Sequence, residues 1–371
     1  MPVYAVNQHI DDVLGVGLPG NQNSVWRFHK IFVEEAAKVG IVLDDSGNAE
    51  KQQIPSETVT ALGVYFDTRS WTWGFKEGKL PRILHTLNKV KESEVMDRKE
   101  LESITGKLGD VKFLVPGGKF NMLYFLQVIH LVEDGRRQVV ISPKLREQAD
   151  WWMVALRAAD TYSPILHPDS QRPSSAKESW SDAAGGTSSH MGAGLGVILT
   201  TGAWSYLPWP AWLNNGRTNE DGVKFASKLS CLEMLGPLAA LCMLGEDALS
   251  EVVVSYVDNQ GSVDIYRKGC SLKCVYASTL AKACYDLSAS MGCTLIVEKI
   301  QRCSDAGSYL ADMISKGDLK QFRAVMPDRL PLTELPHAFV EWVRNPVEDL
   351  HLGFKIAVEL QERIKDIIPM D

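Results

Sequence analysis

Residues 252–263 read VVVSYVDNQGSV. The apolar, largely β-branched run within 251–257 predicts a buried strand, and Asp258 stands directly at its end. A charged side chain embedded in such apolar sequence is costly to bury unless it is paired or binds a metal ion. Asp258 is therefore a candidate functional residue, and the surrounding segments are expected to supply its partners.

Strands and helices are expected to alternate around this strand. The expected strands lie at 178–184, 192–200, 202–208 and 294–300, and the expected helices lie near 230–245, at 275–291 and at 305–316. Three strands, a helix, a strand, helices, a strand and a helix are typical of a mixed α/β domain. Residues 157–177, which precede it, are rich in Pro, Ser and Asp and are the best candidate for a linker.

Three further acidic residues stand in comparable apolar surroundings. Asp182 lies in the first of these strands, Glu233 opens the first helix and Asp312 lies in the last helix. Taken singly, each of these acids is explained by a helix cap, an ion pair or the helix dipole. A further acid, Asp305, stands at the N-terminus of the last helix, on the same face as Asp312. Taken together, four converging carboxylates suit Mg²⁺ or Mn²⁺. Two such ions about 3.5–4 Å apart support phosphodiester cleavage.

The first half of the chain is expected to begin with strands and continue with helices. Strands at 4–9 and 13–16 flank Asp11 and Asp12, a helix is expected at 24–40, a strand run at 58–67 and part of a hairpin at 70–75. Helices are then expected from Pro81, over 97–115, from Lys119 and over 143–156. Residues 76–119 carry a small excess of Lys and Arg, which by charge alone favours a solvated helical face.

Composition excludes several classes of protein. The 371 residues predict two or three domains, and 45% hydrophobic with 23% charged residues exclude a largely disordered chain. A net charge of −7 argues against a protein that coats nucleic acid by charge alone. No apolar run is long enough to cross a membrane, and no secretory signal is visible. The seven cysteines contain no CxxC pair, so we expect reduced thiols in an intracellular protein, cytoplasmic or nuclear and not secreted.

The order of the four acids resembles that of ribonuclease H. The surrounding words SDAAGG (181–186), SKLSCLEMLGPLAAL (227–241), VVVSYVDNQGSV (252–263) and YLADMISKG (309–317) resemble the ribonuclease H domains of DIRS-type retrotransposons, the tyrosine-recombinase retroelements. The resemblance implies that Asp182, Glu233, Asp258 and Asp312 are catalytic and bind two Mg²⁺ (or Mn²⁺) ions. The chain departs from the family at Ser308, where Asn is frequent, and QRCSDAG (301–307) contains no His.

The first half resembles the preceding part of the same polyprotein. HIDDVLGVG (9–17) resembles the reverse-transcriptase palm hairpin, residues 50–68 resemble the next palm segment, and 79–120 resemble the thumb; WVRNP (342–346) extends the resemblance. It implies a vestigial palm metal site at Asp11 and Asp12, for which an acidic β-turn is the alternative. It also implies nucleic-acid contacts from Lys51, Lys76, Lys79, Lys107, Lys112, Trp73 and Asn259. For Trp73 the alternative is packing.

The resemblance predicts an α/β multidomain chain. A residual palm (1–75) and a helical thumb (76–135) are followed by a connection or linker (136–177), a ribonuclease H-like mixed five-stranded sheet with flanking helices (178–325) and a C-terminal extension (326–371). The expected activity is cleavage of the RNA strand of RNA–DNA hybrids. DNA polymerisation is not expected from this chain alone, because the fingers and the first palm Asp are missing. The alternatives are a catalytically decayed scaffold for nucleic acid or protein, and a subunit whose protein partner supplies the missing parts.

Overall fold

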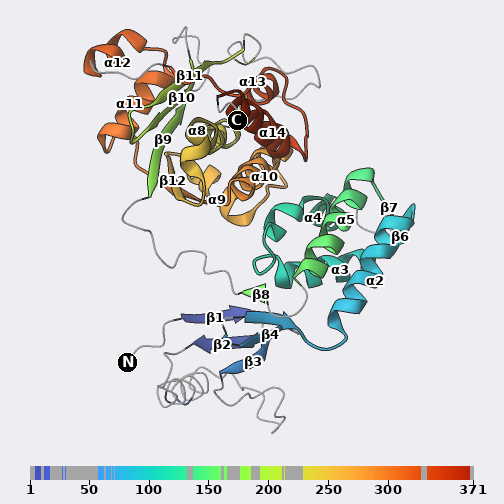
Figure 1. Cartoon of the computed structure of the whole chain (residues 1–371). Coiled ribbons are helices and arrows are strands. Elements are labelled where there is room, and N and C mark those ends of the chain that lie inside the picture. Colours follow the sequence, from blue (N-terminus) through green and yellow to red (C-terminus); the bar gives the residue numbers. More distant parts are fainter. Residues whose placement is uncertain are drawn as a thin grey trace, which may run out of the picture. The chain divides into compact units, whose positions relative to one another are not determined.

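The structure is a computed structural model, shown in Figure 1. It describes residues 5–9, 12–16, 57–61, 64–67, 69–70, 72–131, 137–159, 163–164, 176–184, 193–210, 229–326 and 332–367, together with Arg27, Lys30 and Leu213. The chain divides into two compact units. One comprises Met1–Asn88 with Met153–Leu166, and the other comprises Lys89–Trp152 with His167–Asp371.

The first unit contains two small antiparallel sheets. β1 (Ala5–His9) and β2 (Asp12–Val16) form the expected hairpin, with His9 paired to Asp12. The second sheet has the order β3 (Thr58–Ala61), β4 (Val64–Asp67), β5 (Thr72–Phe75) and β8 (Ser163–Pro164). The prediction of a single strand over 58–67 was wrong, because this segment forms two strands, β3 and β4. Ala61 pairs with Val64, so the run is a hairpin with a two-residue connection.

Three segments expected from the sequence can be compared with the structure here. Apart from Arg27 and Lys30, the helix expected at 24–40 lies outside the described residues. The stretch 157–177, expected as a linker, includes the end of a helix and the strand β8, which pairs with β5. The thumb-like segment contains α2 (Lys79–Glu92), α3 (Arg98–Val111), the 3₁₀ helix η1 (Gly118–Asn121), α4 (Leu123–Leu131) and α5 (Pro143–Ala158).

The beginning of α3 follows from its capping residue. Asp97 accepts hydrogen bonds from the backbone N–H groups of Lys99, at 2.8 Å, and of Glu100, which satisfies donors that the first helical turn leaves free. Two short strands flank the helices, β6 (Val95–Asp97) and β7 (Gln138–Val140), and they pair antiparallel. The sequence did not predict them, because three residues are too few to show an alternating pattern.

The second unit contains the mixed five-stranded sheet that the sequence predicted. Its strands are β9 (Lys177–Ala183), β10 (Gly194–Leu199), β11 (Trp204–Pro208), β12 (Val252–Val257) and β13 (Thr294–Lys299). The order is β11-β10-β9-β12-β13. The pairs β11–β10 and β10–β9 are antiparallel, whereas β12 runs parallel to both β9 and β13. β9 and β12 therefore end at the same edge of the sheet.

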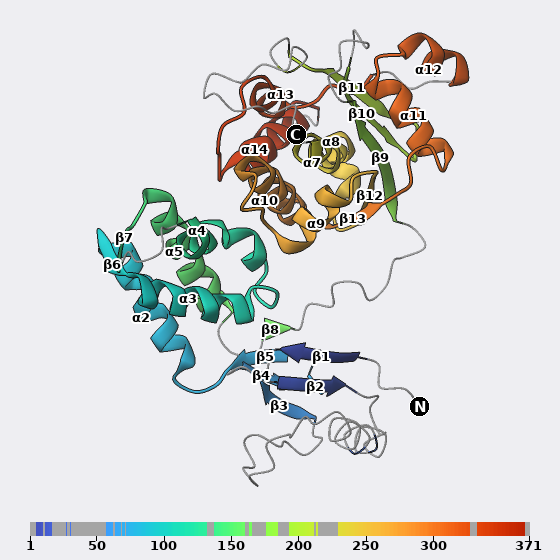
Figure 2. The same cartoon turned by 180° about the vertical axis from the view of Figure 1, so that it is seen from behind.

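Helices cover both faces of this sheet (Figures 1 and 2). α7 (Leu229–Glu233), α8 (Leu235–Leu244) and α10 (Val275–Ser290) share one hydrophobic core with residues of β9, β10, β12 and β13. α11 (Ala306–Ser315) packs on the opposite face, where its apolar residues meet Ile198 and Trp204. α12 (Leu319–Val325) follows α11 and contributes Phe322 to that smaller core.

The described residues of this unit also form the helices α9 (Gln260–Lys268), α13 (His337–Arg344) and α14 (Leu352–Ile367). Of these, α9 and α13 were not expected from the sequence. α9 buries only Ser262 and Tyr266, so its sequence shows no broad apolar stripe. No helix within the described residues is both long and apolar enough to span a membrane. All seven cysteines are free thiols.

Candidate metal centre

Asp182 lies near the end of β9, where small residues let helices approach the sheet closely. Its side chain faces α11, and the Ser315 hydroxyl donates a hydrogen bond to its Oδ2. The cross-strand partner of Asp182 is Gly196, and a Cβ at that position would overlap the backbone of α11 at Ala311 and Ser315. Gly196 is therefore the residue that allows α11 to lie beside Asp182, which is only 5% exposed.

Glu233 reaches the same edge from the other face of the sheet. It ends α7, and the following helix approaches β9 so closely that a Cβ on Gly236 would overlap the Ser181 hydroxyl. The backbone N–H of Ala183 donates to Glu233 Oε1 at 3.3 Å. Oε2 is buried and has no hydrogen-bond partner among the described residues. A buried carboxylate oxygen without a donor needs a cation or a proton.

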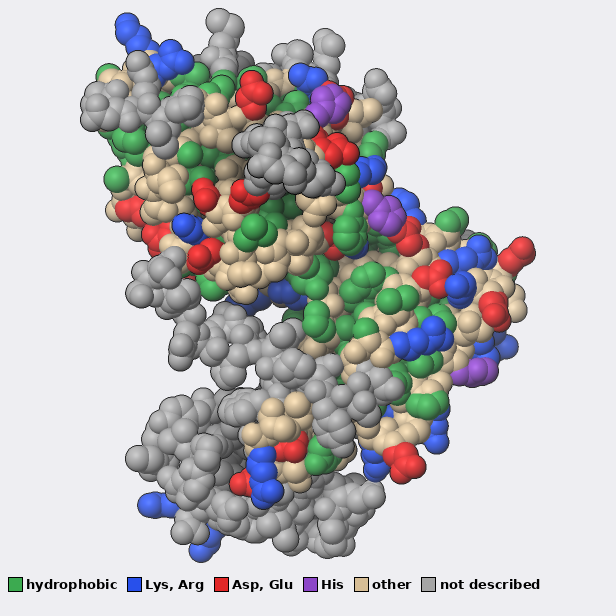
Figure 3. Space-filling view, in the orientation of Figure 1, with side chains coloured by type: hydrophobic (Ala, Val, Ile, Leu, Met, Phe, Trp, Pro, Cys, Tyr) green, Lys and Arg blue, Asp and Glu red, His purple; other side chains and the backbone are tan. Residues whose placement is uncertain are grey.

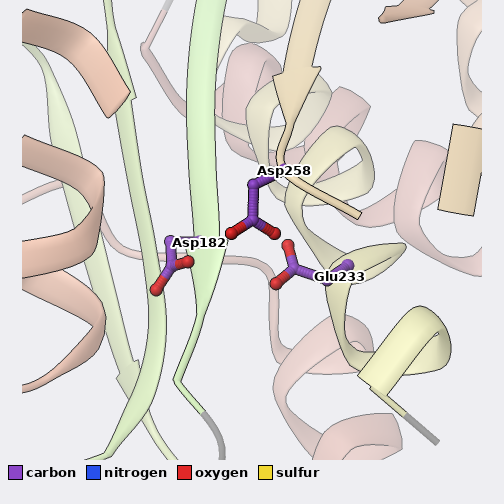
Figure 4. Close-up of side chains that lie close together, drawn as sticks. All are labelled: Asp182, Glu233 and Asp258. Atoms are coloured by element: carbon purple, nitrogen blue, oxygen red, sulfur yellow. The ribbon is translucent and has the colours of Figure 1, made fainter. Parts of the chain in front are cut away.

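Asp258 completes the group from the end of β12. Because β12 runs parallel to β9, the residue after β12 comes to the edge where Asp182 lies. Asp182, Glu233 and Asp258 each offer one oxygen, and these three oxygens lie within 4.8 Å of one another. Figure 4 shows the three carboxylates turned toward a common point. The arrangement offers the hard oxygen ligands that Mg²⁺ and Mn²⁺ prefer.

The electrostatics of the two buried members fit a cation site. Burial raises the pKa of Glu233 well above its ordinary value, and the charges of Asp182 and Asp258 raise it further. Burial also raises the pKa of Asp182, while the Ser315 hydrogen bond and Arg302 act in the opposite direction. Carboxylates that repel one another in a buried site favour either protonation or a bound cation.

The fourth predicted ligand, Asp312, is placed differently. It lies in α11 and is buried, but it does not belong to the group of three. Lys316 donates to its Oδ2 at 2.6 Å, and Arg302 donates to its Oδ1 through Nε, at 2.7 Å, and through Nη2. Burial alone would raise the pKa of Asp312, but the hydrogen bonds from Lys316 and Arg302 lower it below the ordinary value.

Sequence reasoning missed Arg302, which also lies 3.7 Å from Asp182 Oδ2 through Nη2. Its only signal in the sequence is one basic residue in the loop QRCSDAG before the last helix. Asp305, the other candidate considered near Asp312, has a different role. It caps α11 in a capping box with Ser308, the residue at which the resemblance departs from Asn, and it accepts a hydrogen bond from Trp180 Nε1 at 3.0 Å.

The candidate nucleic-acid contacts are spread over both units, and each is described by itself. Lys76 is exposed, while Lys79, Lys107 and Lys112 are partly exposed on or beside helices α2 and α3. Lys112 Nζ lies 5.0 Å from the centre of the Phe113 ring. Basic and acidic side chains are interspersed on the visible face of these helices (Figure 3).

The remaining predicted contacts have other surroundings or cannot be placed. Trp73 is fully buried and packs edge-on against Phe75, which favours the packing alternative for this residue. Asn259 caps α9 through a hydrogen bond from the Ser262 N–H. Lys51 and Asp11 lie outside the described residues, and Asp12 is the first residue of β2, where its backbone is paired with His9.

Comparisons with known proteins give limited similarity. No protein-family model matches the chain, and no curated protein matches it. Among solved structures, foamy viral protease-reverse transcriptase dRH in complex with double-stranded DNA is 12% identical and gives a TM-score of 0.31 over 82% of this chain and 47% of that chain. The foamy viral protease-reverse transcriptase in complex with an RNA/DNA hybrid is 13% identical, with a TM-score of 0.31 over 80% and 36%. The chain thus spans less than half of either protein.

Proposed function

We propose that this chain is a ribonuclease H that cleaves the RNA strand of RNA–DNA hybrids, and that it derives from a DIRS-type retroelement. The observation that supports this proposal is the meeting of three carboxylates from β9, α7 and the end of β12. They occupy the elements in which the resemblance requires catalytic acids. The sheet has the mixed order that such acids need, with the first and fourth strands adjacent and parallel.

The residues present fit a divalent cation. Glu233 Oε2 is buried without a hydrogen-bond donor among the described residues, and the three carboxylates supply only oxygen ligands. Magnesium held there would supply a nucleophilic water at neutral pH and would neutralise charge on the reacting phosphate. We assign one ion to Asp182, Glu233 and Asp258. The two-ion form expected from the sequence also needs Asp312, which Arg302 and Lys316 engage.

The chain's own groups have distinct tasks in this reaction. Ser315 holds Asp182 by a hydrogen bond to Oδ2, and the Ala183 N–H holds Glu233, so both carboxylates are oriented before substrate arrives. Asp258 is only half-buried, so it marks the side of the site that is open to a phosphate. Water adds across the P–O bond of the RNA strand and leaves 3′-hydroxyl and 5′-phosphate ends.

The nucleic-acid specificity belongs to the same proposal. Contacts to 2′-hydroxyl groups on one strand and recognition of duplex shape would distinguish a hybrid from DNA. Lys107 and Lys112 of the thumb-like segment are proposed to contact the sugar-phosphate backbone, since their side chains are partly exposed. Phosphate contacts of this kind fix the position of the protein without reading sequence.

One observation favours a second function, a non-catalytic scaffold that binds nucleic acid. Arg302 places a permanent positive charge beside Asp182 and Asp312, so part of the acidic cluster is neutralised by the protein itself. A decayed active site can be held together in this way. The buried oxygen of Glu233 and the raised pKa of that carboxyl argue for the metal-dependent enzyme instead.

The decisive experiment incubates the full chain with a labelled RNA–DNA hybrid and Mg²⁺ or Mn²⁺. We expect cleavage of the RNA strand by the wild type, no cleavage in chelator and none by Asp258→Asn. Asp264→Asn is the matched control, because Asp264 lies six residues further on in α9 and pairs with Gln260 outside the acidic cluster. Hybrid binding without cleavage under either metal would establish the scaffold and reject the enzyme.

A further inference from the structure

Arg302 lies between two acidic side chains that come from different elements. It precedes α11, and its guanidinium contacts Asp312 of that helix and Asp182 of β9. Both Asp312 oxygens are thereby occupied, because Lys316 binds the other one. The Arg302 side chain is 51% exposed, yet three hydrogen-bond or ion-pair contacts hold its end.

The loop that carries Arg302 has a specific backbone conformation. The Ser304 N–H donates to the Gln301 carbonyl at 3.1 Å, which closes a turn with Arg302 and Cys303 at its centre. Cys303 has a φ of 53°, a left-handed conformation that costs a non-glycine residue free energy. The turn therefore fixes the backbone of Arg302 beside the acidic cluster, and the contacts with Asp182 and Asp312 hold its guanidinium there.

The balance of charge at this edge of the sheet shows what Arg302 does. Four carboxylates gather there: Asp182, Glu233, Asp258 and Asp312. Two of them, Asp182 and Asp312, share the Arg302 charge, whereas neither Glu233 nor Asp258 has an ion-pair partner of its own among the described residues. A cation between Asp182 and Asp312 would have to displace the guanidinium, while a cation among the oxygens of Asp182, Glu233 and Asp258 would leave the contacts of Arg302 with Asp312 in place.

We propose that Arg302 is a positioning residue that takes the place of a second divalent cation between Asp182 and Asp312. The free chain then binds one divalent ion, at Asp182, Glu233 and Asp258. This inference rests on the metal centre in the proposed function. An arginine is always charged, and unlike a metal ion it cannot dissociate from the chain. Arg302 therefore orients Asp182 and Asp312 at every metal concentration.

The test counts bound Mn²⁺ on the full chain by calorimetry and by electron paramagnetic resonance, without nucleic acid. We expect one ion for the wild type and for Arg302→Lys, and two ions for Arg302→Ala and Arg302→Gln. The second ion should disappear again in Arg302→Ala/Asp312→Asn. Because the positive charge returns in Arg302→Lys, any second ion should bind to this variant at least about tenfold more weakly than to Arg302→Ala, too weakly to be counted, which is the size of effect that one neighbouring charge has on a carboxylate.

Controls separate the outcomes. Arg323→Ala removes an exposed arginine of α12 outside the cluster and should bind one ion. Circular dichroism and thermal melting in chelator establish that each variant is folded before ions are counted. Two ions on the wild type, or one ion on folded Arg302→Ala and Arg302→Gln, would overturn the role of Arg302. No ion on the wild type would overturn the metal centre itself.

Discussion

The acidic residues at one edge of the sheet fall into two groups with opposite surroundings. Asp182, Glu233 and Asp258 face one another, and burial and repulsion raise the pKa of the two that are most enclosed. Asp312 is also buried, but hydrogen bonds from Lys316 and Arg302 lower its pKa. The comparison teaches that burial alone does not make a carboxylate a metal ligand. What counts is whether the protein's own cations already occupy both carboxylate oxygens, as Arg302 and Lys316 do at Asp312.

The largest expected effect comes from replacing one member of each group. Asp182→Asn should reduce the initial rate of hybrid cleavage about a thousandfold or more, because a metal ion contributes several kcal/mol to the transition state. Asp312→Asn should reduce the rate only about tenfold, the equivalent of about 1.4 kcal/mol, because Asp312 orients its neighbours through Arg302. Initial rates at saturating Mg²⁺ measure both. Equal losses of rate for the two variants would show that Asp312 is a metal ligand during turnover, and Asp312 would then belong to the same group as Asp182.

The second effect is on stability and combines metal with pH. At about a hundred times its Kd, Mg²⁺ should stabilise the wild type by about 2.7 kcal/mol. In chelator, the free energy of unfolding should decline as pH rises through the raised pKa values of Glu233 and Asp182, since the folded chain retains protons there that the unfolded chain has lost. Denaturant unfolding across a pH series, with and without Mg²⁺, checks both statements.

Glu233→Gln is the informative variant in that series. It replaces an ionisable buried carboxyl, whose Oε2 has no hydrogen-bond partner among the described residues, with a neutral amide. The variant should therefore be more stable than the wild type in chelator at the pH values where Glu233 must ionise, and it should lose the stabilisation by Mg²⁺. Lys89→Gln, which removes an exposed partner of Glu100, is the control and should retain the Mg²⁺ effect. Unchanged Mg²⁺ stabilisation in Glu233→Gln would contradict the placement of the ion.

The smallest expected effect concerns the packing that brings Glu233 to the sheet. Gly236→Ala should destabilise the chain by about 1–3 kcal/mol, because the added Cβ overlaps the Ser181 hydroxyl. Gly109→Ala in α3 is the matched change, since no atom lies within 4 Å of its added Cβ, and it should stabilise by about 0.5–1 kcal/mol. Chemical denaturation measures both. A neutral Gly236→Ala would mean that α8 can move away from β9 without cost.

Much of the sheet domain was predictable because its signals are local. The five strands appear as apolar or alternating runs within two residues of their observed bounds, and the helices at 275–291 and 305–316 are almost exact matches to α10 and α11. The two strands within 58–67 were predicted as one because only two residues separate β3 from β4 in the sequence, which leaves the apolar pattern nearly continuous. α9 was missed because capping by Asn259 and the positive φ of Gly269 define it more than apolar periodicity does.

The sequence by itself determined the four acids and the elements that carry them. A carboxylate within apolar residues is unusual wherever the chain folds, so each could be recognised from its neighbours. The ion pair of Lys316 with Asp312 was also within reach of the sequence, because residues four apart meet on one helix face.

Only the tertiary structure decided how these acids divide. The close approach of α11 to Gly196 and of α8 to Ser181 determines which carboxylate oxygens meet. The turn at Cys303 brings Arg302 to Asp182, although the two residues are 120 positions apart in the sequence. Interactions of this range depend on the packing of separate elements. No local pattern of residues encodes their distances.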